Sequence, residues 1–181
     1  MMLLQRARAV LVVIDLQVRL FPAITDGSFV LDRCCMLIDG ANRFGVPVMV
    51  TEENPVGLGH SLPAIAERVP KAGVHTKMAF DAAAEPEFLR QFNALGRPQA
   101  VLCGTEAHVC VLQTAFGLRA CGVDVFVVAD AVGSRRVRDR DAALMRLGRD
   151  GIRIVTAEMA IFEWTETATD PAFRDMLKLV K

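Results

Sequence analysis

The stretch Val10-Leu-Val-Val-Ile-Asp-Leu-Gln17 decides the fold. Its first five residues, Val10 to Ile14, are all apolar, and the acid Asp15 follows them directly. Because the run does not alternate between apolar and polar residues, both faces of the predicted strand must be covered. A strand that is buried on both faces is typical of a parallel sheet with helices packed on each side.

Five further apolar runs of this kind follow, separated by segments of helical period. The predicted strands are Val10–Ile14, Val46–Val50, Gly73–Lys77, Ala100–Leu102, Val123–Ala129 and Ile152–Val155. The predicted helices are Ser28–Phe44, Glu85–Gly96, Cys110–Ala120, Asp139–Arg149 and Pro171–Val180. This pattern predicts an α/β protein with three layers, in which helices cover a six-stranded parallel sheet. No linker, repeat or low-complexity tract interrupts it, so we expect a single domain over 1–181.

Composition excludes several classes of protein. Of the 181 residues, 52% are hydrophobic and 23% are charged, which is enough apolar material for one core. The 21 basic residues balance the 21 acidic ones, so we expect no nucleic-acid or membrane-surface partner. Arg6 and Arg8 precede an apolar run, as in a signal peptide, but Asp15 and Gln17 interrupt that run. We therefore predict a soluble, cytoplasmic protein.

The cysteines indicate neither a disulfide framework nor a zinc site. There are five of them, and none forms a Cys-x-x-Cys pair; they are Cys34, Cys35, Cys103, Cys110 and Cys121. Among the histidines, His60 is interpreted as a loop residue, because no metal-binding motif surrounds it. We expect reduced thiols, no metal and no cofactor.

Three polar residues stand at or just after predicted strand ends. Asp15 closes the first strand, Lys77 closes the third, and Cys110 follows the fourth. Ligands of open parallel sheets bind at the carboxyl ends of the strands, so these residues are candidates for chemistry. Each alone has a structural interpretation, as a turn residue, a solvated lysine and a buried thiol respectively. The functional hypothesis depends on their joint placement.

The chemistry of a cysteine nucleophile gives this combination a reason. A free thiol has a pKa near 8.5, and the thiolate is the attacking species. An ammonium within about 4 Å of Cys110 contributes roughly 4 kcal/mol at an effective dielectric near 20, which corresponds to about three pKa units. The start of a helix favours the anion as well. We therefore expect Lys77 to hold Cys110 as a thiolate, and Asp15 to transfer the proton.

The motifs resemble those of a known family. They are Val12-Val-Ile-Asp-Leu-Gln17, His75-Thr-Lys-Met-Ala-Phe80, Gly104-Thr-Glu-Ala-His-Val-Cys-Val-Leu-Gln-Thr-Ala115, Val127-Val-Ala-Asp-Ala-Val-Gly-Ser-Arg135 and Met159-Ala-Ile-Phe-Glu-Trp164. Their order and spacing across nearly the whole chain look like the isochorismatase-like hydrolases, and are similar to the isochorismatase domain-containing protein branch. The resemblance implies the Rossmann-like sheet order 3-2-1-4-5-6 and an Asp-Lys-Cys catalytic triad, carried here onto Asp15, Lys77 and Cys110.

Further expectations follow from the same resemblance. It implies a cis peptide between Thr105 and Glu106, oxyanion donors at the backbone N–H groups of Glu106 and Cys110, and a dimer or larger homo-oligomer. Phe21, Phe80 and Leu112 are candidates for the apolar wall of the substrate pocket, with core packing as the alternative for each. Asp81 stands where the family often has Ser, so it either faces the pocket as a second carboxylate or caps the next segment.

The function predicted from these residues is cleavage of a small-molecule amide or related C–N bond through a covalent thioester-type intermediate. The natural substrate and the bond cleaved stay open, because fold and family do not determine the reaction. Two alternatives also stay open. One is a catalytically weak family member that acts as an interaction protein. The other is a redox-sensing thiol at Cys110; no motif marks a resolving cysteine, and Cys103 is a candidate for that role if the turn folds back.

Overall fold

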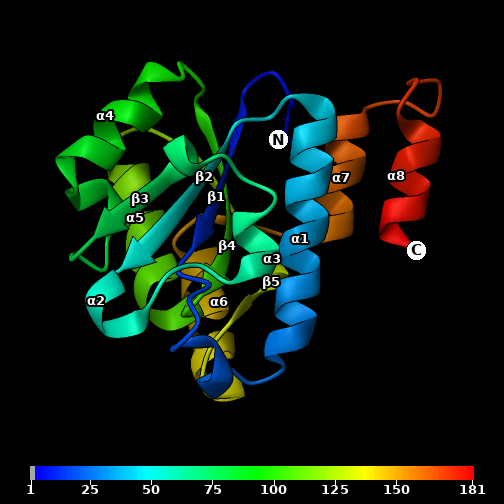
Figure 1. Ribbon diagram of the computed structural model, residues 1–181. Helices are drawn as coiled ribbons and strands as arrows, with labels where there is room; N and C mark the ends of the chain where they lie inside the picture. The colour runs from blue at the N-terminus through cyan, green and yellow to red at the C-terminus, as the bar shows by residue number, and fades with distance from the viewer. Residues whose placement is uncertain (1–2) are drawn as a thin grey trace.

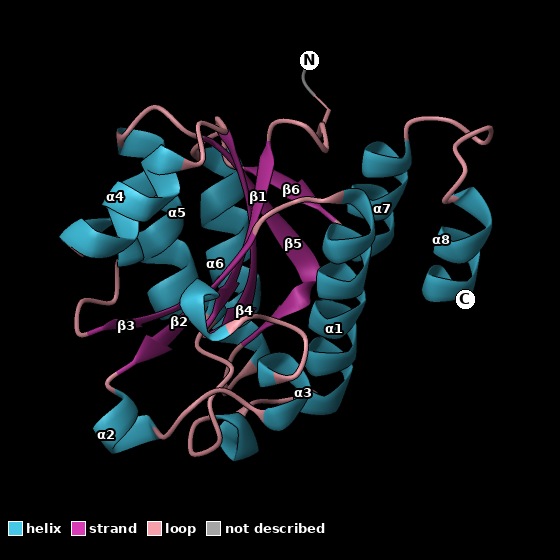
Figure 2. Ribbon diagram, turned by 45° about the horizontal axis from the view of Figure 1, so that its top comes forward, coloured by secondary structure: helices cyan, strands magenta, loops and turns pink. Residues whose placement is uncertain are grey.

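A computed structural model describes residues 3–181. Its six strands form one sheet of order β3-β2-β1-β4-β5-β6, and every neighbouring pair is parallel (Figures 1 and 2). The predicted strand number, direction and order are therefore confirmed. The strands are β1 (Ala9–Ile14), β2 (Val48–Glu53), β3 (Val74–Lys77), β4 (Gln99–Thr105), β5 (Asp124–Gly133) and β6 (Arg153–Val155).

Helices cover both faces of this sheet. One face carries α1 (Gly27–Phe44), α7 (Ala157–Thr165) and α8 (Phe173–Val180), and the other carries α4 (Pro86–Ala94), α5 (Leu112–Ala120) and α6 (Val137–Arg149) (Figure 2). The sequence patterns did not predict α7 as a helix. The remaining short elements are η1 (Phe21–Ala23), α2 (Pro55–Leu58), α3 (Pro63–Ala66), η2 (Lys71–Gly73), η3 (Ala82–Ala84) and η4 (Ala107–Val111).

The central strand β1 explains why its sequence is apolar at each position. All six of its residues are buried. Alternate side chains point to opposite faces of a strand, and Leu11 packs with Trp164 of α7 in one core cluster while Val12 packs with Phe92 of α4 in the other. Two separate cores therefore share one sheet. A polar residue within β1 would be buried whichever face it pointed to.

Three strands extend further toward their carboxyl ends than predicted. β2 ends at Glu53 rather than Val50, β4 ends at Thr105 rather than Leu102, and β5 ends at Gly133 rather than Ala129. The predicted end of β2 was wrong because Thr51, Glu52 and Glu53 are polar, while a strand can carry polar residues where their side chains find buried partners. The extension of β2 brings Glu53 to the edge of the sheet where Asp15 and Lys77 lie.

Gly104 allows β4 to end close to β1. Its φ is +108°, and the register between β4 and β5 shifts between Leu102 and Gly104. A Cβ at this position would overlap the carbonyl oxygen of Ile14, so both the conformation and the close approach require glycine. The next residue, Thr105, then donates its hydroxyl to the carbonyl oxygen of Asp15 at 2.8 Å.

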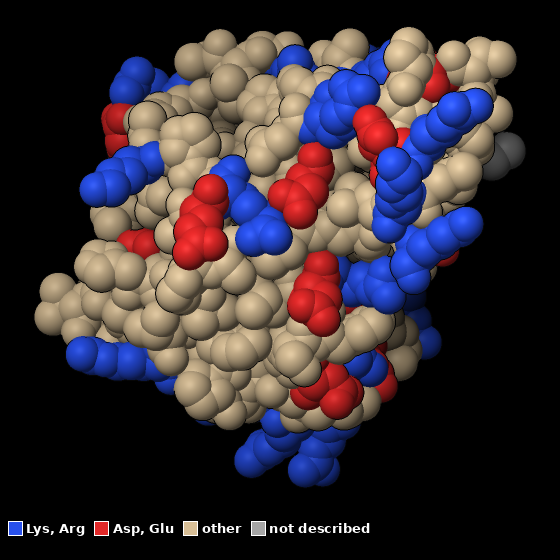
Figure 3. All heavy atoms as spheres, turned by 45° about the vertical axis from the view of Figure 1, so that its right-hand side comes forward, with Lys and Arg blue, Asp and Glu red and all other residues tan. Residues whose placement is uncertain are grey.

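The outer surface carries charges of both signs. On the face of α1 and α8, basic and acidic side chains lie among one another (Figure 3). The ion pairs of the described residues include Arg6–Asp170 at 2.7 Å and Arg43–Asp175 at 3.4 Å. Within residues 3–181, no helix combines the length and apolar character needed to cross a membrane.

Candidate active site

The three residues singled out in the sequence meet at the carboxyl edge of the sheet. Lys77 Nζ lies 2.8 Å from Asp15 Oδ2. Cys110 Sγ and carboxylate oxygens of Asp15 and Glu53 all lie within 4.8 Å of one another. Asp15, Lys77 and Cys110 are each at least 94% buried, with exposed fractions of 0%, 3% and 6%. Residues that the sequence places at or just after three different strand ends are therefore close together in space.

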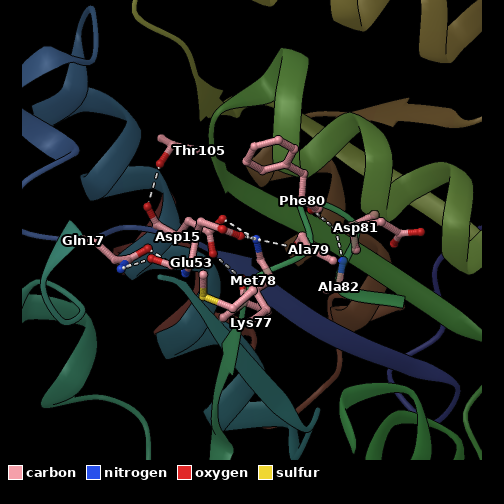
Figure 4. Close-up of polar contacts among 12 residues, drawn as sticks. Asp15, Gln17, Glu53, Lys77, Met78, Ala79, Phe80, Asp81, Ala82 and Thr105 are labelled. Carbon is pink, nitrogen blue, oxygen red and sulfur yellow. Dashed lines mark hydrogen bonds and ion pairs between the residues drawn. The ribbon is translucent and has the colours of Figure 1, made fainter. Parts of the chain in front are cut away.

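Asp15 is held by the ends of three strands. It follows β1 directly with a positive φ of 49°, a conformation that Asp tolerates better than most residues. Its Oδ1 accepts a hydrogen bond from the Thr51 hydroxyl of β2 at 2.7 Å. Its backbone N–H donates to Thr51 O, and its carbonyl accepts from Thr105 of β4. These contacts orient the carboxylate toward Lys77 of β3 (Figure 4).

Lys77 lies between two carboxylates. Besides Asp15, its ammonium contacts Glu53 Oε2 at 2.7 Å and the carbonyl oxygen of Ala79 at 3.3 Å (Figure 4). Burial by itself would lower the pKa of Lys77, but the attraction of Asp15 and the hydrogen bonds to both carboxylates outweigh it, so the pKa is raised. The side chain is therefore a permanent cation at neutral pH.

Glu53 belongs to the site although the sequence reasoning did not identify it. The pair Glu52-Glu53 after an apolar run was a usable signal, but the predicted strand stopped at Val50. The side chain of Gln17 holds the backbone of Glu53: Nε2 donates to Glu53 O and Oε1 accepts from Glu53 N, each at 2.9 Å. Gln17 Nε2 also donates to the carbonyl oxygen of Gly59 at 2.6 Å.

Cys110 lies in η4, a single π-helical turn that leads into α5. Its pKa departs from the sequence expectation in direction. Burial raises the pKa of the thiol most, the nearby carboxylate of Asp15 raises it further, and Lys77 lowers it without compensating. The expected resting thiolate is therefore wrong. Lys77 by itself would favour the thiolate, but burial and the Asp15 carboxylate together outweigh it.

The turn before Cys110 has the expected backbone geometry. The peptide bond between Thr105 and Glu106 is cis. The side chain of Glu106 contacts Arg135: its Oε2 accepts hydrogen bonds from the backbone N–H and Nε of that residue. His108 approaches Ser134, with Nδ1 and Oγ 3.0 Å apart.

The three candidate wall residues lie in different environments. Phe21 is half-buried in η1 and packs against the core cluster of α1. Phe80 is 51% exposed. Leu112 is buried in the core cluster of α5 and, with His108, also lines a cavity of about 260 Å³ beside α6. Core packing thus describes Leu112 well, whereas the exposed ring of Phe80 is free of that constraint.

Asp81 takes the capping role that was one of its two interpretations. Its Oδ1 accepts from the N–H of Ala83 at 2.8 Å at the start of η3. In Figure 4 its carboxylate points away from Asp15, Glu53 and Lys77. It packs against Gly117 of α5, where a Cβ would overlap the carboxylate oxygens. Asp81 therefore serves the local fold.

Two groups of side chains contain atoms that could bind a metal ion. The ligand atoms of Asp15, Glu53 and Cys110 are close enough to surround a cation, but the ammonium of Lys77 already contacts both carboxylates. Glu52 points elsewhere: it accepts from the N–H and hydroxyl of Ser61, each at 2.7 Å, and lies 2.9 Å from His60 Nδ1. The contact with Glu52 makes His60 part of a loop anchor.

Comparisons with known proteins identify the family. The isochorismatase domain model matches residues 9–159. Isochorismatase domain-containing protein 2 of Danio rerio is 34% identical over 173 residues, which cover 95% of this chain and 86% of the relative. A structure described as the MAR1 ribonuclease of Caenorhabditis elegans is 31% identical, with a TM-score of 0.93 over 99% of this chain and 92% of that one.

A more distant structure shares the fold. The YcaC gene product of Escherichia coli, described as an octameric hydrolase of unknown specificity, has a TM-score of 0.89 at 22% identity, over 98% of this chain and 96% of that one. The family model covers most of the chain, and the sheet order is the one that the sequence motifs led us to expect. The chain therefore belongs to the isochorismatase family, whose members have a hydrolase fold.

Proposed function

We propose that this protein is a cysteine hydrolase that cleaves a small-molecule amide or related C–N bond. The observation that carries the proposal is the buried cluster in which Lys77 Nζ lies 2.8 Å from Asp15 Oδ2, with Cys110 Sγ beside the two carboxylates. A nucleophile, a proton acceptor and a fixed cation in one buried site are the parts that thiol-based acyl transfer needs.

The reaction begins from a protonated thiol, because the pKa of Cys110 is raised. As Sγ attacks the carbonyl carbon, its proton moves to Asp15. The developing oxyanion accepts hydrogen bonds from the backbone N–H groups of Glu106 and Cys110. Collapse of this adduct breaks the C–N bond, and Asp15 gives the proton to the departing amine. The acyl group is left on Cys110 as a thioester.

Hydrolysis of the thioester uses the same groups in reverse. Water attacks the thioester carbon and gives a proton to Asp15. Breaking the C–S bond then releases the carboxylic acid, and the proton returns to Sγ. Lys77 keeps its charge throughout, so it stabilises the thiolate as it forms and orients Asp15. The mechanism needs no metal or cofactor, and Phe21, Phe80 and Leu112 are proposed to contact the substrate.

The test compares wild type with Cys110→Ala and Cys110→Ser on a panel of small amides, for example acetamide, butanamide and benzamide. We expect release of ammonia from these primary amides by wild type, loss of turnover in Cys110→Ala, and an acyl adduct on Cys110 by intact mass after rapid quenching. Unfolding midpoints of the three proteins serve as the folding control. Turnover that survives in Cys110→Ala contradicts the proposal.

The alternatives give other outcomes in the same experiment. Absence of turnover, with a protein partner recovered by pull-down, favours the interaction protein. Reversible oxidation of Cys110 by peroxide without hydrolysis favours a redox sensor. Cys103 is not its resolving cysteine, because Cys103 belongs to the core cluster on the α1 face whereas Cys110 belongs to the cluster on the α5 face.

The Caenorhabditis elegans relative described as a ribonuclease suggests one further test, which uses RNA as the substrate. The balance of 21 basic and 21 acidic residues gives no excess charge to attract a phosphate backbone, so we expect no cleavage of a single-stranded RNA oligonucleotide. RNA cleavage that Cys110→Ala abolishes, without any amide turnover, contradicts the proposed substrate class.

We also propose that one domain spans 1–181 and that the protein is a cytoplasmic homo-oligomer. The two core clusters share one sheet, which supports a single domain. All five cysteines are free, which suits a reducing compartment. The related YcaC protein is described as an octamer, which supports assembly. Size-exclusion chromatography with light scattering tests it, and a mass of one chain contradicts it.

A further inference from the structure

The turn that carries Cys110 forms hydrogen bonds with the residues that follow β5. Glu106 Oε2 accepts the backbone N–H of Arg135 at 3.0 Å and its Nε at 3.1 Å. The Glu106 side chain is 9% exposed, so its charge is nearly removed from water. A buried carboxylate needs hydrogen-bond partners, and Arg135 provides two to the same oxygen.

A second contact lies two residues further along the turn. His108 Nδ1 lies 3.0 Å from the hydroxyl of Ser134, which is 2% exposed. Ser134 and Arg135 are themselves anchored, because Thr25 donates its N–H to Ser134 O at 3.1 Å and its hydroxyl to Arg135 O at 2.9 Å. The consecutive residues Ser134 and Arg135 therefore bind the turn at two points.

We propose that Ser134 and Arg135 are positioning residues for the nucleophile turn, defined as Glu106 to Val111. They act through His108 and Glu106 and determine where the backbone N–H groups of the turn point. The inference rests on the proposed function, because those N–H groups are its oxyanion donors. Neither residue touches the reacting atoms in this role.

The physical reason is the short range of oxyanion stabilisation. Donors contribute when they lie about 2.7–3.1 Å from the oxyanion, so small displacements of a turn cost rate. Glu106 supplies one donor from its own backbone while its side chain is fixed by Arg135. His108 precedes Cys110 by two residues and is fixed by Ser134. The turn that supplies the backbone N–H donors is therefore attached at Glu106 and at His108 to the residues that follow β5.

The experiment uses Ser134→Ala and Arg135→Met in the full chain. Donors that act only in the transition state change kcat rather than KM. We expect kcat per titrated active site to fall by about tenfold, less than the roughly 100-fold loss of a whole donor, with KM unchanged. Both Arg135 variants keep the backbone N–H bond to Glu106, but only Arg135→Lys keeps a side-chain charge, so its kcat should lie between those of Arg135→Met and wild type.

Matched controls separate positioning from general surface effects. Arg138→Met removes an exposed arginine of α6, and Ser28→Ala removes an exposed serine of α1. Both should keep the wild-type kcat. A merely structural role for Ser134 and Arg135 would lower the unfolding midpoint while kcat per titrated site stays at the wild-type value. That result overturns the inference.

A second readout works without any substrate. Iodoacetamide labels Cys110 and the exposed Cys121, and intact mass with peptide mapping gives both rates. Releasing the turn should expose Cys110, so Ser134→Ala and Arg135→Met should label Cys110 several-fold faster with the Cys121 rate unchanged. If wild type hydrolyses no amide, the proposed function fails, and this readout alone decides the positioning role. Unchanged Cys110 labelling then overturns it.

Discussion

The side chain of Gln17 pairs with the backbone of Glu53 as a neighbouring strand would. Its amide nitrogen donates to Glu53 O and its amide oxygen accepts from Glu53 N, both at 2.9 Å. This pairing continues the contact between β1 and β2 beyond the last ladder residues, Ile14 and Thr51. It places the Glu53 carboxylate 2.7 Å from Lys77 Nζ. Gln17, which is outside the proposed triad, thus determines the environment of the Lys77 ammonium.

Replacing Gln17 should destabilise the fold. In Gln17→Leu the buried N–H and C=O of Glu53 lose their partners, and each unsatisfied group costs about 1–3 kcal/mol. We expect the free energy of unfolding in urea to fall by about 2 kcal/mol or more. Gln113→Leu, at an exposed position of α5, is the control and should change it little. Equal losses in the two variants would contradict the pairing.

The thiol of Cys110 should react slowly near neutral pH. Its pKa is raised by burial and by Asp15, so the thiolate fraction rises only well into the alkaline range. Iodoacetamide labelling of Cys110 should therefore lag behind that of the exposed Cys121 at pH 7 and increase with pH. Because Asp15→Asn removes the second cause, it should label Cys110 faster than wild type at the same pH.

The same variant separates reactivity from catalysis. Asp15→Asn should lose amide hydrolysis even as its thiol reacts faster, because the proton acceptor is gone. Thr51→Val serves as a milder companion, since it removes the hydrogen bond to Asp15 Oδ1 but keeps the carboxylate. Labelling that slows in Asp15→Asn would show that Asp15 does not raise the pKa of Cys110.

Gly117 and Asp81 should show coupled effects on stability. A Cβ at Gly117 would overlap the Asp81 carboxylate, so Gly117→Ala forces the side chain that caps η3 to move. We expect a loss of about 1–3 kcal/mol, the range typical of overpacking. Asp81→Ser has a shorter side chain, so Gly117→Ala should cost less in that background. A double-mutant cycle of unfolding free energies measures the difference, and additive losses would contradict the contact.

His75 should make the fold sensitive to mild acid. Burial lowers its pKa, with Glu87 acting weakly in the opposite sense, so the unfolded chain binds a proton at a higher pH than the folded protein does. Stability from this residue is therefore complete above about pH 6.5, the usual histidine value, and decreases as the pH falls below it.

Replacing His75 with Leu should flatten that decrease. The difference between wild type and His75→Leu should change by no more than about 1.4 kcal/mol per pH unit below pH 6.5 and be constant above it. Urea unfolding between pH 5 and pH 8 gives both curves. The ring packs edge-on against Phe88 at a centroid distance of 5.6 Å, so a constant loss of packing energy is expected in addition. Parallel curves would contradict the titration.

Sequence alone predicted the parallel sheet and the three candidate residues Asp15, Lys77 and Cys110. Runs that are apolar at each position require burial on both faces, and only a parallel sheet between helices provides it. In such a sheet the carboxyl ends of the strands share an edge, so Asp15, Lys77 and Cys110 were expected at the same edge. The motif resemblance supplied the strand order and the position of the cis peptide.

Tertiary structure decided the electrostatics of the site and what holds it in place. The pKa of Cys110 depends on burial and on the charges of Asp15 after β1 and Lys77 of β3, and no spacing in the sequence measures those distances. Whether Glu53 belongs to the site depended on where β2 ends, and the polar residues at the end of β2 made that end hard to predict. Ser134 and Arg135 reach the nucleophile turn across 26 and 29 residues of sequence. Hydrogen bonds of that range exist only once the chain has folded.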